Sequence, residues 1–316
     1  MSGSPKPLSI VIPTYNRSAL LTQCLDALRT QTAGIESFDI TVVDDHSPDD
    51  TPDVLRNAAQ SMPNLTWTRQ PENRGPAAAR NRAASLSTGR LLLFLDDDIV
   101  ASPDLVETHL RLHDNRGAQH GVVGHVSWLP GLKVTPFMTW VEEHPVLFNY
   151  ANMTAGPQEN IPAAFYTCNL SLARATFEAA GGFDERFPFP ACEDTDLGVR
   201  LANEGFSLWY EPGAIAWHAR AITLSDLRSR LRQTAPSVEL FAQLHPETLL
   251  PGSEGHSRPD TPLWRLVRAV KRSLLRLAVQ VTPSVGGYDL RSMHYACELG
   301  HAQLAGLRDL RRQQRT

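Results

Sequence analysis

The chain of 316 residues has little cysteine, no long apolar run and no excess of positive charge. Its four cysteines, Cys24, Cys168, Cys192 and Cys297, are widely separated, and none belongs to a Cys-x-x-Cys pair. This spacing argues against a disulfide framework or a zinc site and is typical of reduced thiols. The net charge of −4 argues against a general nucleic-acid-binding protein, so we expect no nucleic acid among its partners.

The lack of a long apolar run bears on location. No stretch approaches the roughly 18 consecutive apolar residues of a membrane span, and residues 1–7 lack the apolar core of a signal peptide. We therefore expect a cytoplasmic protein. Contact with the inner face of a membrane stays open, because residues 262–316 carry 10 Lys and Arg against 3 Asp and Glu, whereas residues 1–261 carry 20 against 31.

The most informative stretch is residues 91–100, in which five apolar residues run into Asp96, Asp97 and Asp98. A continuous apolar run of this length predicts a buried strand with an acidic end. Because side chains alternate along a strand, Asp96 and Asp98 are expected on one side and Asp97 on the other. Two carboxylates in one space favour a divalent cation, and oxygen ligands suit magnesium or manganese. Taken alone, the pattern fits a solvated acidic turn equally well.

Strands and helices alternate through the first hundred residues. Further strands are expected at 8–13, 38–43 and 65–68, and helices at 18–29, 52–60 and 77–85. Ser18 is expected to cap the first helix. This alternation predicts an α/β fold with a mostly parallel central sheet flanked by helices. Polar clusters at 13–17, 44–47 and 96–98 all follow strand ends, which favours one shared cleft at the carboxyl edge of the sheet.

The second half of the chain is less regular. We expect a helix at 104–113, a strand within 121–129, a strand at 167–172 and a helix at 174–180, while the Trp- and Pro-rich residues 130–160 stay unassigned. Glu193, Asp194 and Asp196 begin another helix, where acids are favoured by the helix dipole and a simple cap explains them. Two closing strands are expected at 206–210 and 214–217, with His218 just beyond.

The C-terminal region has a different composition. Residues 250–262 form a linker by their Gly, Pro and Ser content. A helix at 263–281 would place Leu263, Leu266, Val267, Val270, Leu274 and Leu277 on one face and its basic residues largely elsewhere. Such a helix fits an anionic membrane surface, packing against the acidic body of the protein, or self-association through residues 263–316.

Six short motifs occur in one order along the first 220 residues. They are residues 13–17, 42–47, 73–75 with 79–81, 94–98, 181–184 and 193–197. Together they resemble the family 2 glycosyltransferases of the GT-A fold, over about residues 7–220. The resemblance implies a GT-A domain at 1–220, with a nucleotide-binding half at about 1–100 and an acceptor half at about 101–220. A helical continuation at 221–249, the linker and the basic amphipathic helical region at 263–316 would follow.

The resemblance also implies a donor site. The residues that it assigns to the nucleotide are Pro13, Thr14, Tyr15, Arg17, Asp45, Asn73, Arg80, Asp96 and Asp97. Of these, Asp45 is expected to accept a hydrogen bond from the base. Asp98, Asp96 and His218 are expected around Mn²⁺ or Mg²⁺, and the imidazole tilts the preference toward manganese. The ion would stabilise the charge of a departing diphosphate.

For catalysis, the resemblance implies Asp194 as the general base, with Glu193 as the alternative. A base is needed because an acceptor hydroxyl is a poor nucleophile at neutral pH. The expected reaction is an inverting hexosyltransferase-type displacement, with a UDP-sugar as donor and a hydroxyl of a glycan, lipid-linked sugar or small molecule as acceptor. The Gln-x-x-Arg-Trp motif and membrane helices of processive synthases are lacking, so transfer is expected to be non-processive.

Two alternatives remain. A sugar-nucleotide pyrophosphorylase would carry a Gly-rich loop with Arg after the first strand, whereas Pro13, Thr14 and Tyr15 stand there. A catalytically inactive nucleotide-sugar-binding relative is the other alternative. Intact carboxylates at Asp96, Asp98 and Asp194 argue against it.

Overall fold

The computed structural model of the chain describes residues 6–114, 117–147, 149–248, 262–281, 284–285 and 288–313. It divides into two compact units. The first comprises Met1–Lys133 and Phe148–Ala221, and the second comprises Val134–Leu147 and Ile222–Thr316. Residues 134–147, which the sequence analysis places in the acceptor half, therefore group with the C-terminal helices.

A mixed sheet forms the centre of the first unit. Its strands are β1 (Leu8–Thr14), β2 (Phe38–Asp44), β3 (Leu65–Arg69), β4 (Leu91–Leu95), β5 (Ile99–Ala101), β6 (His120–Trp128), β7 (Gly156–Pro157), β8 (Asn169–Ala173) and β9 (Ser207–His218). They are ordered β3-β2-β1-β4-β8-β6-β9-β5, with β7 beside β9. Strands β1 to β4 are mutually parallel and β6 is parallel to β9, while β5, β7 and β8 run the other way. The expected mostly parallel sheet is confirmed.

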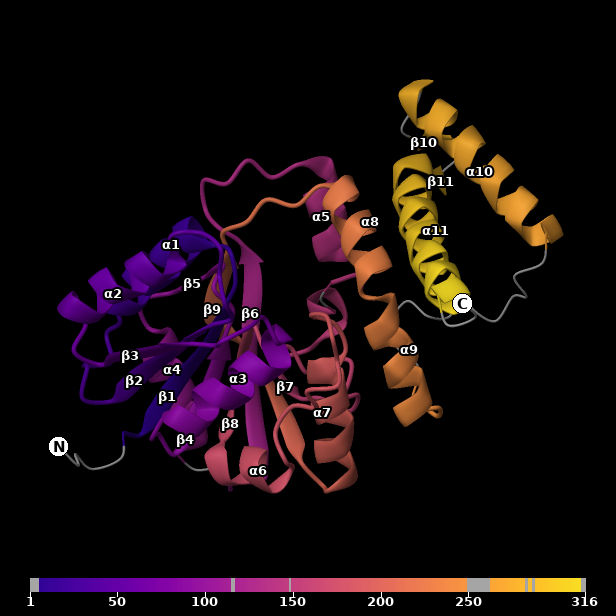
Figure 1. The fold of residues 1–316 in the computed structure, drawn as a ribbon. Coiled ribbons are helices and arrows are strands. Elements are labelled where there is room, and N and C mark those ends of the chain that lie inside the picture. The colour runs from indigo at the N-terminus through magenta and orange to yellow at the C-terminus, as the bar shows by residue number, and fades with distance from the viewer. Residues whose placement is uncertain are drawn as a thin grey trace. The chain divides into compact units, whose positions relative to one another are not determined.

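Helices flank this sheet. They are α1 (Ser18–Arg29), α2 (Thr51–Ser61), α3 (Gly75–Leu86), α4 (Leu105–His113), α6 (Arg174–Ala179) and α7 (Glu193–Asn203), with a 3₁₀ turn η1 at Tyr150–Asn152. In Figure 1, α3 lies across the face of the strands, and it packs on β1 and β2. Its buried residues Ala77, Ala79 and Ala83 are small, so the helix can approach the sheet closely and hold Arg80 against the strand ends.

The strand predicted at 91–100 is interrupted by a turn. β4 ends at Leu95, and the turn at Asp97 and Asp98 is closed by the amide of Ile99, which donates to the Asp96 carbonyl at 3.2 Å. The chain resumes as β5, which pairs with β9. The alternation of side chains holds only along extended backbone, so it cannot be applied through the three carboxylates.

Three other local predictions need correction. β1 continues through Pro13 to Thr14, which is tolerated because β1 pairs with β4 only as far as Val11 and so needs no donor at Pro13. The two closing strands are one strand, β9, with a shift of register opposite Gly124. α1 begins at Ser18, but its cap comes from another segment, since the Asp49 carboxylate accepts from the Ser18 amide at 3.0 Å.

The second unit is helical. It contains α5 (Pro136–Glu143), α8 (Leu224–Gln233), α9 (Ala235–Leu244), α10 (Pro262–Val281) and α11 (Leu290–Gln313), with a short hairpin of β10 (Ser284–Val285) and β11 (Tyr288–Asp289). α11 packs against α8, α9 and α10. Trp140 of α5 donates from Nε1 to Ser292 Oγ at 2.6 Å, and its ring contacts Tyr295. Part of the unassigned Trp-rich stretch thus belongs to this helical unit.

One prediction falls almost wholly outside the described residues. The predicted linker at 250–262 lies outside them except for Pro262. Within the described part of the chain, no helix combines the length and the apolar character that crossing a membrane requires. A cytoplasmic location and contact with a membrane surface stay predictions.

Candidate active site

The site lies where several strands end together. β1, β2, β4 and β9 run in the same direction, so their carboxyl ends meet at one edge of the sheet. The loops there are joined directly, since the amide of Asn16 donates to Ser47 Oγ at 2.9 Å. Thr14 Oγ1 donates to Asp97 Oδ2 at 2.7 Å. The three polar clusters that the sequence places after strands therefore gather at one edge.

Arg17 holds the acidic turn together. Its Nη1 lies 2.9 Å from Asp97 Oδ1 and 3.0 Å from Asp98 Oδ2. Asp97 and Asp98 thus share one cation. A turn replaces the strand there, so the alternation from which Asp96 and Asp98 were expected on one side does not apply. Burial raises the pKa of Asp97 to about 6, against the opposing effect of Arg17. The turn therefore holds negative charge that is only partly compensated.

His218 is brought to Asp98 by the pairing of β5 with β9. Ile99 lies opposite His218, and the amide of Ala219 donates to the Asp98 carbonyl at 2.8 Å. The Nε2 atom of His218 is 3.6 Å from Asp98 Oδ2. The Trp128 and His218 rings pack edge to face, with ring centroids 5.6 Å apart. Two predicted metal ligands therefore face each other.

The tautomer of His218 decides what its Nε2 can do. Nδ1 lies 3.1 Å from the carbonyl oxygen of Arg220 and 3.3 Å from its amide nitrogen, so either tautomer finds a partner there. When Nδ1 carries the proton and donates to that carbonyl, the Nε2 lone pair faces Asp98. This is the form that binds a metal ion.

Arg80 joins the two halves of the site. It is buried on α3, and its Nη2 donates to Asp96 Oδ1 at 2.7 Å while its Nη1 donates to Glu193 Oε1 at 2.9 Å. The ring of Phe183 packs against the guanidinium, 5.6 Å from its carbon to the ring centroid. The sequence analysis assigns Arg80 to the nucleotide. Both terminal nitrogens are bonded to carboxylates here, so its visible role is to position Asp96 and Glu193.

Asp194 follows Glu193 in the first turn of α7. The amide of Thr195 donates to its Oδ1 at 2.7 Å. Burial, and then the negative charge of Glu193, raise the pKa of Asp194 to about 7, against the opposing effect of Arg80. A carboxyl group that titrates near neutral pH is suited to accept a proton from a hydroxyl.

The backbone around the site is strained. Three described residues other than glycine have a positive φ: Asn16 (56°), His46 (66°) and Cys192 (70°). The first two follow β1 and β2, and Cys192 directly precedes the Glu193 and Asp194 pair. Such conformations cost of order 1–3 kcal/mol each and are concentrated at functional sites.

The Asp45 carboxylate, just after β2, accepts hydrogen bonds from the loop between β3 and α3. Its Oδ1 accepts from Gln70 Nε2 and from the amide of Arg74, and its Oδ2 accepts from the amide of Gly75, each at 2.8 Å. The carboxylate thereby fixes the loop that carries Asn73 to the start of α3. Oδ1 already accepts two hydrogen bonds, whereas Oδ2 accepts one and keeps a second lone pair. The predicted hydrogen bond with a nucleotide base stays a prediction.

The remaining residues assigned to the nucleotide differ in exposure. Pro13 and Thr14 are buried, whereas Asn73 is exposed and Tyr15 has 44% of its surface exposed. The exposed pair is available to a ligand. The buried pair supports the loop from beneath.

Asn81 has a role that its place in the sequence did not reveal. Its Nδ2 donates to the Phe183 carbonyl at 2.9 Å and to Glu185 Oε1 at 3.0 Å, and its Oδ1 accepts from the Phe183 amide at 2.9 Å. A Cβ on Gly182 would come within 2.7 Å of that Oδ1. The motifs at 79–81 and 181–184 are thus two sides of one contact, which their sequence separation conceals.

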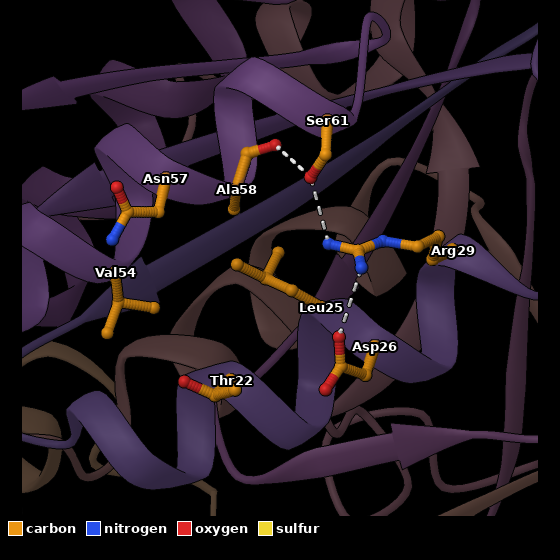
Figure 2. Close-up of a pocket in the computed structure, with 8 residues that line it drawn as sticks. All are labelled: Thr22, Leu25, Asp26, Arg29, Val54, Asn57, Ala58 and Ser61. Atoms are coloured by element: carbon orange, nitrogen blue, oxygen red, sulfur yellow. Dashed lines mark hydrogen bonds and ion pairs between the residues drawn. The ribbon is translucent and has the colours of Figure 1, made fainter.

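A hollow of ≈ 380 Å³ lies elsewhere, between α1 and α2. Figure 2 shows Arg29 reaching from α1 toward Ser61 of α2 and toward Asp26, at 3.2 Å and 3.7 Å. None of the residues lining this hollow is a predicted site residue. We assign it no part in the site.

The residues at the acidic turn fit a divalent ion. Among the described residues, no three or more His, Cys, Asp and Glu side chains are grouped in a way that could hold a metal. Magnesium and manganese sites that serve nucleotides commonly use one or two protein ligands, with phosphate oxygens and waters completing the set. Asp98 and His218 match that smaller set, and the cationic Arg17 shows that the turn accommodates positive charge.

The comparison with known families identifies the chain. Residues 9–173 match the family described as Glycosyl transferase family 2. The chain belongs to glycosyl transferase family 2. The match spans β1 to β8 and includes the acidic turn.

Curated family 2 relatives resemble this chain in part. Validoxylamine A glucosyltransferase of Streptomyces hygroscopicus is 33% identical over 221 residues, which cover 64% of this chain and 52% of that protein. The poly(ribitol-phosphate) beta-glucosyltransferase of Bacillus spizizenii is 39% identical over 101 residues, covering 31% and 16%. This family 2 chain therefore spans about half the length, or less, of these relatives.

Solved structures confirm the fold. A mannosyltransferase from Pyrobaculum calidifontis, in complex with GDP-Man and Mn²⁺, superposes with a TM-score of 0.61 at 19% identity, covering 97% of this chain and 90% of that one. Residues 1–349 of TarS from S. aureus superpose with a TM-score of 0.56 at 15% identity, covering 97% and 91%. The expected GT-A architecture is confirmed by these likenesses.

Proposed function

We propose that this family 2 member transfers a sugar from a nucleotide diphosphate sugar to an acceptor hydroxyl. The observation that carries the proposal is the bridge through Arg80, which ties Asp96 to Glu193, next to Asp194. It sets the carboxylates that would face the donor and the carboxylate that would face the acceptor around one buried guanidinium. A non-catalytic nucleotide-binding protein would have no use for the second carboxylate group.

The donor side would be organised by the acidic turn. Asp98 and His218 would hold Mn²⁺ or Mg²⁺, with Asp96 nearby, and the ion supplies positive charge that stabilises the departing diphosphate. Arg17, whose side chain keeps 35% of its surface exposed, is placed to contact a phosphate as well as Asp97 and Asp98. The exposed residues Tyr15 and Asn73 would flank the nucleotide.

On the acceptor side, Asp194 would take the proton from the hydroxyl. The hydroxyl oxygen bonds to the anomeric carbon as the bond from that carbon to the diphosphate oxygen breaks, so the configuration inverts. The diphosphate leaves with the electron pair, and the proton stays on Asp194. One base is enough for this single displacement.

The donor and acceptor are proposed by class. We propose a UDP-sugar as donor, which is supported by the TarS structure captured with UDP. The mannosyltransferase was captured with GDP-Man, so a GDP-sugar is the alternative for the experiment to exclude. The relatives named for validoxylamine A and for poly(ribitol-phosphate) support a hydroxyl acceptor on a small molecule or a polyol phosphate, and we propose one sugar added per encounter.

The substitution Asp194→Asn tests the proposal. It keeps the shape of the side chain but removes the base, so we expect turnover to fall by about 10²-fold or more while nucleotide binding is unchanged. Transfer is measured as nucleotide diphosphate released in the presence of acceptor, and binding by calorimetric titration with UDP and manganese.

The matched control is Glu204→Gln, an exposed acid at the other end of α7 that should leave both quantities unchanged. Unchanged turnover in the Asp194 variant would refute the base assignment. Loss of nucleotide binding along with turnover would place Asp194 on the donor side instead.

A further inference from the structure

Two arginines of α10, Arg272 and Arg276, bind a carboxylate of α11. Glu298 of α11 is fully buried, and Arg272 of α10 donates to its two oxygens at 2.6 and 2.8 Å. Arg276 donates to the same carboxylate at 2.6 Å, and Arg228 of α8 lies 3.3 Å from it. Burial opposes the charge of Glu298, but Arg272 and Arg276 outweigh it and lower its pKa to about 2. This cluster fixes the rotation of α10 about its own axis.

With Arg272 and Arg276 bound to Glu298, α10 presents apolar side chains to solvent. Val270, Leu274 and Leu277 have 50%, 61% and 63% of their surfaces exposed, whereas Leu275 on the inner side has 7%. A single exposed leucine is ordinary on a protein surface. Three large apolar side chains in a line along one helix form a patch that calls for a covering partner.

The spacing of this patch is that of a coiled-coil seam. Val270, Leu274 and Leu277 are separated by four and then three residues. In the sequence, Leu263 and Val267 precede them and Val281 follows them, which continues the same alternation of four and three. Apolar residues in this strict pattern form a narrow stripe that packs against another helix with the same stripe. The 20 residues of α10 make a seam about 30 Å long.

We propose that α10 is a self-association surface that pairs with α10 of a second copy of this chain. A stripe of this kind is self-complementary, as a two-fold symmetric interface requires. The positions beside it at Ser273, Ala278 and Gln280 are uncharged. Among residues 270–281, Lys271 is the charged residue next to the seam, so two copies meet with little repulsion between like charges.

The same orientation disfavours a lipid surface. A helix that lies on an anionic membrane carries its Lys and Arg along the border of the apolar face, where they reach the headgroups. Here Arg272 and Arg276 are on the opposite side, where both are bound to Glu298. The sequence alone is compatible with a second copy of α10 and with a lipid surface. The ion pairs of Arg272 and Arg276 with Glu298 favour the second copy.

The seam predicts reversible association. About three heptads are near the lower limit for a coiled coil, so we expect dissociation in the micromolar range. Sedimentation or light scattering from about 1 to about 100 µM should show the average mass of the full chain rise from 34.9 kDa toward twice that value.

The test substitutes the centre of the seam. The double variant Leu274→Lys with Leu277→Lys should stay at the mass of one chain over the whole range. The matched control is Ala269→Lys, which adds the same side chain at an exposed position of α10 off the stripe and should associate like the native protein. Because the substituted leucines are largely exposed, the circular dichroism spectrum should not change, which separates lost association from lost folding.

Three results would overturn the inference. They are a native protein that stays a monomer throughout, a double variant that associates as the native protein does, and monomers that bind phosphatidylserine vesicles through the stripe. The last result would assign α10 to a lipid surface. The inference is independent of transferase activity, because no site residue is altered and no turnover is measured.

Discussion

At the scale of single residues, three consecutive carboxylates have three different surroundings. Asp96 bonds to Arg80 and is one-third exposed, Asp97 is buried against Thr14 and Arg17, and Asp98 lies between Arg17 and His218. The strand ends at Leu95 and a turn follows at Asp97 and Asp98, so the three side chains are not placed by strand geometry. Substitutions at these positions should therefore differ in effect, although the residues are chemically identical.

The pKa of Asp194 leads to a prediction about pH. A base must be deprotonated to act, and burial and Glu193 raise the pKa of Asp194 to about 7. We therefore expect kcat/KM for sugar transfer to fall about tenfold per pH unit below about pH 7 and to level off above it. A pH profile at constant ionic strength, with saturating manganese, measures this.

The variant Glu193→Gln serves as the partner experiment. It removes the like charge beside Asp194, so the rising limb of the profile should move to lower pH. A limb that stays in place would mean that Asp194 is not the titrating base.

At the scale of elements, the contact between α3 and the segment before α7 positions Arg80. Asn81, the neighbour of Arg80, holds Phe183 by two hydrogen bonds to its backbone. Phe183 in turn packs under the guanidinium. A substitution that weakens the contact between Asn81 and Phe183 should therefore shift Arg80 and, through it, Asp96.

Two adjacent glycines allow a matched test of that contact. Gly182 has φ +69°, and a Cβ there would meet Asn81 Oδ1 at 2.7 Å, whereas Gly181 has φ +76° with no atom within 4 Å. Both Gly→Ala variants should lose at least about 1 kcal/mol of unfolding free energy through backbone strain. Gly182→Ala should lose more and should also reduce kcat.

Denaturant unfolding and steady-state kinetics measure the two effects. Gly181→Ala is the control for strain without a clash. Equal losses in both variants, with equal kcat, would show that the Asn81 contact does not support the site.

At the scale of the whole molecule, every predicted site residue lies in the first unit, although those residues span positions 13 to 218. A ligand that binds this unit only in its folded state should raise its unfolding temperature. We expect stabilisation by UDP together with manganese, of about 2.7 kcal/mol at 100 times the dissociation constant. UDP-, GDP- and dTDP-sugars are compared in the same assay, which ranks the three nucleotides by the stabilisation that each gives.

The variants Asp98→Asn and His218→Gln should lose the part of the stabilisation that depends on manganese. Asp104→Asn, an exposed acid beyond β5, should keep it. Stabilisation by GDP-sugars instead of UDP-sugars would correct the donor proposal and leave the metal assignment intact. Equal stabilisation of all four proteins by manganese would refute the metal assignment.

Local patterns in the sequence were enough to predict many elements of this protein. The apolar periods predict the helices around 18–29 and 104–113 and the strands at 38–43 and 65–68 to within a residue or two. They do so because the buried face of each element is marked by apolar residues at a regular spacing in the sequence. The ordered motifs were enough to indicate the family. They also pointed to the edge of the sheet where the polar clusters gather.

Only the tertiary structure decided which of those residues meet. The deciding contacts join positions from 22 to 102 residues apart. They are those of Asp97 and Asp98 with Arg17, of Asn81 with Phe183, and of Arg272 and Arg276 with Glu298. Such contacts depend on how elements pack and rotate against one another. The sequence determines the pattern of apolar and polar residues within each helix or strand. Which residue of another element a side chain contacts depends on the tertiary structure.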